Sequence, residues 1–257
     1  MDALPPWLTT AIAVVVMAGI ATIALAVMRV PGPWSVLTAI ARAALQLSLL
    51  SLVLTGIIQD PVWVAAGLTV MLGAAIWTAS RRARLPWRGL GPLAAAMLIG
   101  PLTVLVVVFA TGAIESSPRY ALAIGGIIIG NTMTVAILTE RVYRDAVRDH
   151  WDEVEGWLAL GATPWQSTRS LAQRAVRTAL LPSLDQTRTT GIVVLPGAFV
   201  GAIFAGASPI EAGRFQLVVL AGILAAGSLT AVTLLRLRGG VAQRPADIPT
   251  SPPRRRR

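Results

Sequence analysis

Long apolar runs dominate this sequence, and each is close in length to a membrane-spanning α-helix. Such a helix needs roughly 20 consecutive apolar residues. Lipid provides no hydrogen-bond partners for the backbone, so only helices and closed barrels cross it, and barrel strands would alternate in polarity. We therefore predict an all-α polytopic membrane protein with about seven transmembrane helices. Their approximate bounds are 8–28, 35–58, 62–80, 91–111, 119–140, 187–206 and 213–236.

The composition agrees with a protein that lies largely in lipid. Hydrophobic residues make up 55% of the chain and charged residues 13%, and the mean hydropathy is +0.70. Soluble domains have roughly 45–50% apolar and about 25% charged residues. The formal charge is +10, but every basic residue is an arginine and the arginines follow the loops, which argues against a nucleic-acid partner. The chain has no cysteine, so neither disulfides nor thiolate metal sites can form.

The arginines predict the orientation of the chain in the membrane, because short cytoplasmic loops retain positive charge. They follow the first, third, fifth and seventh runs, whereas the opposite loops are poor in arginine. This alternation places the N-terminus outside and the C-terminus in the cytoplasm, as in a multi-pass protein of a bacterial inner membrane. We predict a transmembrane domain over 1–238 and a disordered, arginine-rich cytoplasmic tail over 239–257, where proline and like charges offer nothing to fold around.

One connection, residues 141–186, is much longer than the others and has an internal pattern. It begins with apolar side chains at spacings of three and four, which predict an amphipathic helix continuing from the fifth run. Gly161 suits a helix end, because glycine adopts the left-handed cap conformation without steric cost. Thr163, Pro164 and Gln166 match a capping box with proline at the first helical position. We expect a rigid corner, in which a helix stops at the glycine and a second helix runs from Pro164 toward the next proline. The apolar stripe consists of Tyr143, Val147, Trp151, Val154 and Leu158.

The corner also carries large apolar side chains that need a surface to pack on. They are Trp157, Leu158, Leu160 and Trp165. Tryptophan often lies at membrane interfaces, so these side chains could rest on lipid headgroups or on other loops. They could equally contact a partner protein, and the residues themselves do not decide between the two.

The corner belongs to a longer resemblance. The runs EGWLALGATPWQSTR, LALGATPWQSTRSLAQRAVRTALLPSL and GIVVLPGAFVGAIFAGASPIEAGRFQLVV, with IIIGNTMT and RAALQL upstream, resemble the FetB (YbbM) family of ABC-transporter permeases. Members of this family are assigned to iron export, and plant relatives are linked to aluminium tolerance. The likeness covers essentially the second to the seventh apolar run.

The resemblance implies a permease homodimer that pairs with a separately encoded ATP-binding subunit, and this partner would bind ATP and magnesium. The chain has no Gly-x-x-x-x-Gly-Lys-Ser/Thr loop and no lysine at all, so we expect it not to be an enzyme by itself. In such permeases a cytoplasmic corner docks on the ATPase. The matching coupling positions here are Glu155, Gly161, Thr163, Pro164 and Trp165. The importer pattern places its following proline nearer to the glycine than Pro182 lies, so import is not implied.

Polar side chains inside the apolar runs are candidates for a translocation pathway, because such groups tend to face a protein interior or water. Arg42 and Gln46 share one helical face, although Arg42 could equally snorkel to the surface. Asn131 could equally form an interhelical hydrogen bond beside close-packing glycines, and the family pattern Gly-Asn-x-Met adds Met133. Leu195-Pro196-Gly197 interrupts a run and frees a carbonyl, as packing kinks also do. The full set is Arg42, Gln46, Asn131, Met133, Pro196 and Gln216.

The apolar runs encode no durable iron site. Iron favours carboxylate, imidazole or thiolate ligands, yet the single histidine, His150, lies in the long connection and no run interior contains Asp or Glu. The metal could pass transiently along amide, carbonyl and thioether groups, or the cargo could be chelated or organic. Glu115, Glu140 and Glu211 could attract cations at the two mouths, or be ordinary solvated loop charges.

Three classes of function therefore remain. The first is the permease subunit of an ABC transporter that exports iron or another metal ion. The second is an ion-driven secondary transporter of a small solute, against which the lack of intramembrane carboxylates counts. The third is a non-transporting membrane scaffold, in which a broken sixth run and buried polar groups would be needless. We favour the first.

Overall fold

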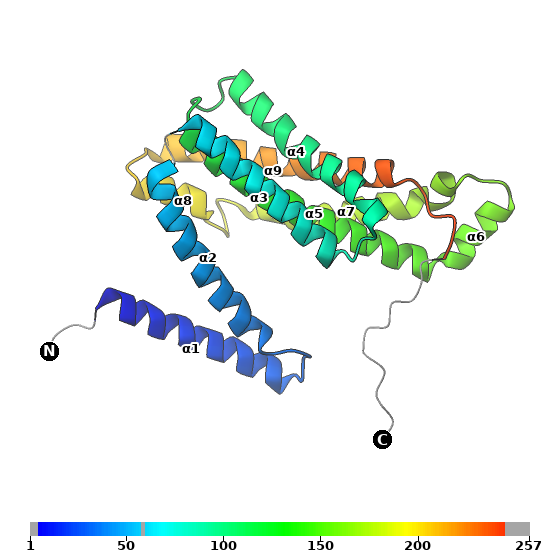
Figure 1. Ribbon diagram of the computed structural model, residues 1–257, viewed down its shortest axis with the longest axis horizontal. Coiled ribbons are helices and arrows are strands. Elements are labelled where there is room, and N and C mark those ends of the chain that lie inside the picture. The colour runs from blue at the N-terminus through cyan, green and yellow to red at the C-terminus, as the bar shows by residue number, and fades with distance from the viewer. Residues whose placement is uncertain (1–4, 58–59, 245–257) are drawn as a thin grey trace. The chain divides into compact units, whose positions relative to one another are not determined.

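The computed structural model describes residues 5–57 and 60–244, except for the side chains of Pro6 and 52–57, and the described part is all-α, as predicted (Figure 1). The elements are α1 (Pro6–Val27), α2 (Ser35–Ile57), α3 (Pro61–Arg82), the 3-10 turn η1 (Trp87–Gly89), α4 (Leu90–Ala110), α5 (Pro118–Asp149), α6 (Trp151–Ala159), α7 (Pro164–Thr189), α8 (Gly197–Phe204) and α9 (Pro209–Arg238). Most of the tail predicted to be disordered, from residue 245 onward, lies outside the described residues.

The chain divides into two compact units, Met1–Gln59 and Asp60–Arg257. In the first unit α1 and α2 pack on each other. The turn between them holds Arg29 and Gly32 at positive φ, +52° and +74°. The second unit contains the helices from α3 to α9 and all of the corner.

Five described helices are long and apolar enough to cross a membrane, which supports a polytopic membrane protein. They are α1 from Trp7, α3, α4 together with η1, α5, and α9. The apolar stretch of α2 is shorter, Ser35–Ser51. The predicted number of seven spans is not confirmed, and the orientation of the termini stays a prediction.

The helix α5 lies at the centre of the second unit and contacts α3, α4, α7 and α9; Figure 1 shows α3, α5 and α9 running side by side. Small residues let these helices approach closely. A Cβ added to Gly100 of α4 would lie 2.6 Å from the carbonyl oxygen of Ala226 in α9. Thr230 Oγ1 of α9 donates to Ala96 O of α4 at 3.2 Å. The bundle is thus held by close backbone contact and an interhelical hydrogen bond.

The sixth predicted span, 187–206, is wrong as a single helix. The chain leaves α7 after Thr189 and makes a turn in which Gly191 has a φ of +85° and its N–H donates to Val194 O at 2.9 Å. The short helix α8 begins only after Pro196. The break has a local cause: glycine permits positive φ, and proline lacks the N–H that a helix interior needs.

Candidate functional site

The corner, defined here as α6, residues 160–163 and the first turn of α7, has the predicted geometry. Gly161 has a φ of +88°, and its N–H donates to Leu158 O at 3.0 Å. The N–H of Ala162 donates to Trp157 O, also at 3.0 Å. This pair of hydrogen bonds is a Schellman motif, which ends α6 and satisfies its last carbonyls.

The predicted capping box starts α7. The N–H of Gln166 donates to Thr163 Oγ1 at 3.3 Å, and the N–H of Thr163 donates to Gln166 Oε1 at 2.8 Å. Pro164 is the first helical residue, as expected. Because hydrogen bonds fix both helix ends that meet there, the corner is a stiff element.

The apolar stripe of the corner packs inside the protein. Tyr143, Val147 and Val154 are buried against Leu171 of α7 and Leu235 of α9. Trp151, Leu158 and Trp165 pack on this cluster. In contrast, Leu160 is 83% exposed, and Glu155 and Trp157 are exposed beside it. The corner therefore packs Trp151, Val154, Leu158 and Trp165 inside the protein and presents Trp157 and Leu160 outward.

Glu140 is a buried charge. The sequence suggested either an ordinary solvated charge or a carboxylate that attracts cations at the mouth of a pathway, and both interpretations are wrong. Its side chain is 0% exposed, and the residue lies near the end of α5 that leads to the corner. Its carboxylate pairs with Arg238 of α9, and Arg144 Nη2 lies 3.9 Å from Oε1. Arg144 also donates to Ala83 O just after α3. Burial is possible because two guanidinium groups compensate the carboxylate, and the cluster ties α3, α5 and α9 together at this end.

The helix α7 runs antiparallel to α5, with α9 also alongside. Tyr143 of α5 donates from its hydroxyl to Thr168 Oγ1, at 3.0 Å, near the corner. Farther along, Ala179 of α7 is buried against Val135 of α5 and Ala231 of α9. Both α5 and α9 are candidate spans, whereas α7, although 26 residues long, is not. The second half of α7 therefore lies level with the apolar stretches of its two neighbours.

The opposite face of α7 is exposed and charged. Arg174, Arg177, Asp185 and Arg188 lie on it, at spacings that keep them on one side of a helix. Arg188 Nη1 is 3.5 Å from Asp185 Oδ1, and the two side chains are 71% and 64% exposed. We call this surface the polar face of α7.

A lipid environment for the polar face is excluded by its cost. An arginine or aspartate at the centre of a membrane helix costs about 2.5–3.5 kcal/mol on insertion scales. Arg177, Asp185 and Arg188 all lie in the half of α7 that packs on the apolar stretches, so together they would cost up to about 8–10 kcal/mol before any ion pairing. That sum is comparable to the whole stability of a typical domain. The polar face must therefore meet water, a polar cargo or another polar protein surface.

Pro182 supports the same conclusion and corrects the expectation that α7 ends near it. Proline in a helix removes the hydrogen bond to the carbonyl four residues earlier, here that of Thr178. Both residues are exposed on the same side of α7, so water or a polar neighbour can pair with the free carbonyl. In lipid that carbonyl would stay unpaired, at a cost of several kcal/mol. The helix continues through Pro182 because the missing bond lies on its polar side.

A pocket of about 300 Å³ lies where α7 ends. It is lined by Thr190 and by Pro196 and Gln216, two of the predicted pathway residues. Gln216 is 6% exposed, and its Oε1 accepts no hydrogen bond within the described part of the chain. An unpaired buried acceptor is costly, so this oxygen is suited to a donor from water or cargo. Of the other predicted pathway residues, Arg42 and Gln46 are exposed on α2, in the first unit.

The two predicted pathway residues of α5 lie on different sides of that helix. Asn131 is one turn from Val135 and so on the side of α5 that contacts α7. Its Nδ2 donates to Ile127 O of its own helix at 2.9 Å, and not across to another helix. Met133 packs instead against the core formed by α3, α4 and α5. Asn131 is thus the better placed of the two for a path along α7.

Acidic groups do not gather into a metal centre in the described residues: no three His, Cys, Asp or Glu side chains there lie close enough to hold an ion. Glu211, expected at the outer mouth, caps α9, and its Oε2 accepts from the N–H of Ser208 at 3.0 Å. Glu115 is exposed in the connection between α4 and α5.

The sequence predicted a helix from Pro164 toward Pro182, but not its continuation to Thr189 or its packing against α5 and α9. A signal was present in Ala175, Ala179 and Ser183, small residues at spacings of four that are all buried. Such a repeat is typical of helices that pack closely within membranes. Read together with the charges on the other side, it predicts a helix packed on apolar spans with one polar face.

Comparison with known proteins shows relatives over most of the chain. A family model described as "Uncharacterised protein family (UPF0014)" matches residues 7–239. The UPF0014 membrane protein STAR2 of Oryza sativa subsp. japonica is 36% identical over 198 residues, which are 76% of this chain and 70% of STAR2. The protein ALUMINUM SENSITIVE 3 of Arabidopsis thaliana is 35% identical over 196 residues, 76% of this chain and 72% of the relative.

A bacterial relative agrees with the resemblance found in the sequence motifs. The Escherichia coli (strain K12) protein named "Probable iron export permease protein FetB" is 31% identical over 204 residues, which are 77% of each chain. No solved structure matches the chain. Since the family match covers every helix from α1 to α9 almost completely, the chain belongs to the UPF0014 family of membrane proteins.

Proposed function

We propose that this chain is the permease subunit of an ABC transporter that exports iron, or another metal, across a bacterial inner membrane, and that a separate ATP-binding subunit drives it. The name of the Escherichia coli relative supports the cargo and the permease role. The five helices that could cross a membrane support a transport subunit. By itself the chain hydrolyses nothing, and ATP and magnesium bind to the partner.

One observation carries the proposal: α7 is a single helix that joins the corner to the Gln216 pocket. It begins at the capping box of Thr163 and ends at Thr189, next to the pocket residue Thr190. Its 26 residues span about 39 Å. A movement imposed on the corner therefore reaches the polar face and the pocket within one element, as coupling to a distant ATPase requires.

The ATP-binding subunit docks on the outward side of the corner. Trp157 and Leu160 are exposed there, and Glu155 adds a charge beside them. Apolar and aromatic side chains on a rigid turn suit a groove on a partner, because little conformational entropy is lost on binding. Gly161 and the Thr163–Gln166 capping box shape the turn, whereas Trp165 packs inward and supports it.

The polar face of α7 lines the path of the cargo, and a homodimer places two such faces around it. Three arginines and one aspartate give the face a net positive charge. A bare metal cation is repelled by such a surface, whereas a metal bound to a carboxylate chelator is attracted. We therefore assign the cargo as a chelated metal that passes Asn131 and the Gln216 pocket, with no fixed metal cage.

Transport by the reconstituted complex tests the proposal. Proteoliposomes that contain the chain and its ATP-binding subunit should move radioactive iron, supplied as ferric citrate, only with ATP, and the chain alone should not. Ferrous ion without chelator is the control cargo, and it should be transported more slowly than ferric citrate. Iron movement by the chain alone under a proton or sodium gradient would replace the ABC assignment with a secondary transporter. Equal transport rates for ferrous ion and ferric citrate would contradict the assignment of a chelated cargo, but not the assignment of an ABC permease.

Crosslinking tests the docking surface separately. The chain has no cysteine, so a single cysteine at Leu160 is the only thiol and can be joined to the ATP-binding subunit by a short bifunctional reagent. Val193, exposed in the turn at the far end of α7, provides the matched control position. We expect crosslinks from Leu160→Cys and none from Val193→Cys. Crosslinks from Val193→Cys would contradict docking at the corner. An active complex in which neither position forms crosslinks would likewise show that the corner is not the docking surface.

A further inference from the structure

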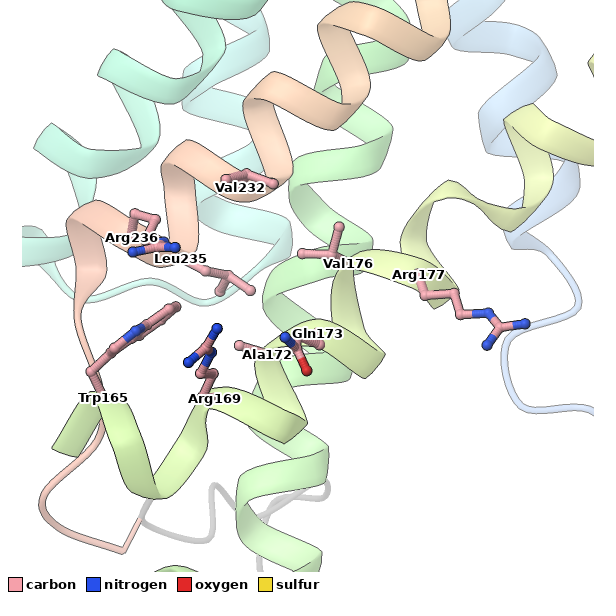
Figure 2. A pocket seen from close by; sticks show the side chains of 9 residues that line it. All are labelled: Trp165, Arg169, Ala172, Gln173, Val176, Arg177, Val232, Leu235 and Arg236. Carbon is pink, nitrogen blue, oxygen red and sulfur yellow. The ribbon is translucent and has the colours of Figure 1, made fainter. Parts of the chain in front are cut away.

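A second pocket, of about 290 Å³, lies between α7 and α9 at the corner end of the bundle (Figure 2). Its apolar wall is formed by Trp165, Ala172, Val176, Val232 and Leu235. Its polar lining is formed by Arg169, Gln173, Arg177 and Arg236. The described lining thus carries positive charge and contains no acidic side chain.

Two of the arginines face the same space. In Figure 2 the side chains of Arg169, from α7, and Arg236, from α9, both lie next to the Trp165 ring, whereas Arg177 points away from it. The guanidinium carbon of Arg236 is 5.1 Å from the centroid of that ring. Neither Arg169 nor Arg236 forms an ion pair with any described residue. Two neighbouring cations without a counter-ion form a site that favours a bound anion.

Apolar side chains lead from this pocket along α9. Val232 is part of the lining, and Leu229, three residues earlier, is exposed on the same side of the helix. The helix α9 is a candidate membrane span, and Arg236 lies in its last turn. The site therefore has cations at the end of a span and an apolar surface running away from them toward the middle of that span.

We propose that this pocket binds an anionic phospholipid, with the headgroup phosphate on Arg169 and Arg236 and an acyl chain along Val232 and Leu229. Basic pockets between transmembrane helices on the cytoplasmic side bind anionic headgroups. Trp165 fits this role because tryptophan favours the membrane interface. A soluble phosphate shares the headgroup chemistry but leaves the apolar surface beside it uncovered, so the geometry favours the lipid. The assignment does not rest on the transported cargo or on the ATPase.

Lipid binding by the purified full chain tests the proposal. In a neutral detergent, phosphatidylglycerol should remain bound in native mass spectra and should raise the melting temperature, whereas phosphatidylcholine and inorganic phosphate should not. Each arginine near a headgroup contributes enough to weaken binding about five-fold when lost. Arg169→Gln and Arg236→Gln should therefore each show about a five-fold loss of affinity, and the double variant about a thirty-fold loss.

Two further variants keep the test specific. Arg174→Gln removes the same charge from the same helix but lies outside the pocket lining, so it should bind phosphatidylglycerol normally. Val232→Trp leaves both pocket arginines in place and blocks the apolar surface, so it should weaken lipid binding while the melting temperature without lipid stays unchanged. An equal loss in Arg174→Gln would show binding by overall charge and overturn the site. Equal stabilisation by inorganic phosphate, or no selective retention of phosphatidylglycerol, would overturn the lipid assignment.

Discussion

Single cysteines can show whether the polar face of α7 meets water, because the chain contains no other thiol. Thr178 and Asp185 are exposed on the side of α7 that carries the polar face, and Val106 is exposed on the apolar helix α4. The cysteine thiolate attacks methanethiosulfonate reagents, and a cysteine pKa of about 8.5 in water leaves a few per cent thiolate near neutral pH. Transfer into hydrocarbon raises that pKa by about two units or more, so the labelling rate falls at least about 100-fold.

The expected order of rates follows from these positions. In proteoliposomes, Thr178→Cys and Asp185→Cys should react at rates near that of free cysteine, and Val106→Cys at least about 100-fold more slowly. Ala179→Cys, next to Thr178 but on the buried side of α7, should also be slow. Uniformly slow labelling of all four variants, each confirmed as folded by gel filtration, would place the polar face in a dry environment. The cargo path proposed along α7 would then be refuted.

Three other substitutions test packing and coupling. Glu140→Ala leaves two arginines around a buried site without their counter-ion and should destabilise the protein by about 3–5 kcal/mol, a fall in melting temperature of about 6–20 °C, whereas Glu155→Ala on the exposed corner should change little. Gly161→Ala puts a side chain at a φ of +88°, at a cost of about 1–2 kcal/mol, and should lower the iron exported per ATP hydrolysed. Gly156→Ala, inside α6 with open space around it, should keep that ratio, and a normal ratio in both variants would exclude the turn from coupling. Gly100→Ala places a Cβ 2.6 Å from a backbone oxygen of α9 and should lower the melting temperature; an unchanged value would mean that α4 and α9 separate without cost.

The parts of the structure that local chemistry controls could be predicted from the sequence. Gly161 and the pair Thr163 and Gln166 determine the corner through hydrogen bonds within a few residues, and the structure has them as expected. Pro182 misled the prediction because its effect depends on which side of α7 it occupies. That side is decided by the packing of Ala179 and its neighbours against α5 and α9, which are distant in sequence.

The site depends even more on distant contacts. Glu140 looked like a solvated charge because its main partner, Arg238, lies at the other end of the second unit's sequence. Pro196 and Gln216 were each selected from polarity or a broken run, but no local pattern indicated that they line one pocket. The chemistry of single residues was readable, whereas their assembly required the fold.

The unbroken course of α7 has a mechanical consequence. A helix of about 39 Å that turns by about 10° around the corner moves its far end by about 7 Å. Because Ala179 is buried against Val135 of α5 and Ala231 of α9, such a turn of α7 requires these two helices to move with it or to repack. In the proposed permease, a modest rotation of the corner would thus become a displacement of several ångströms, about 7 Å, at the pocket end of α7.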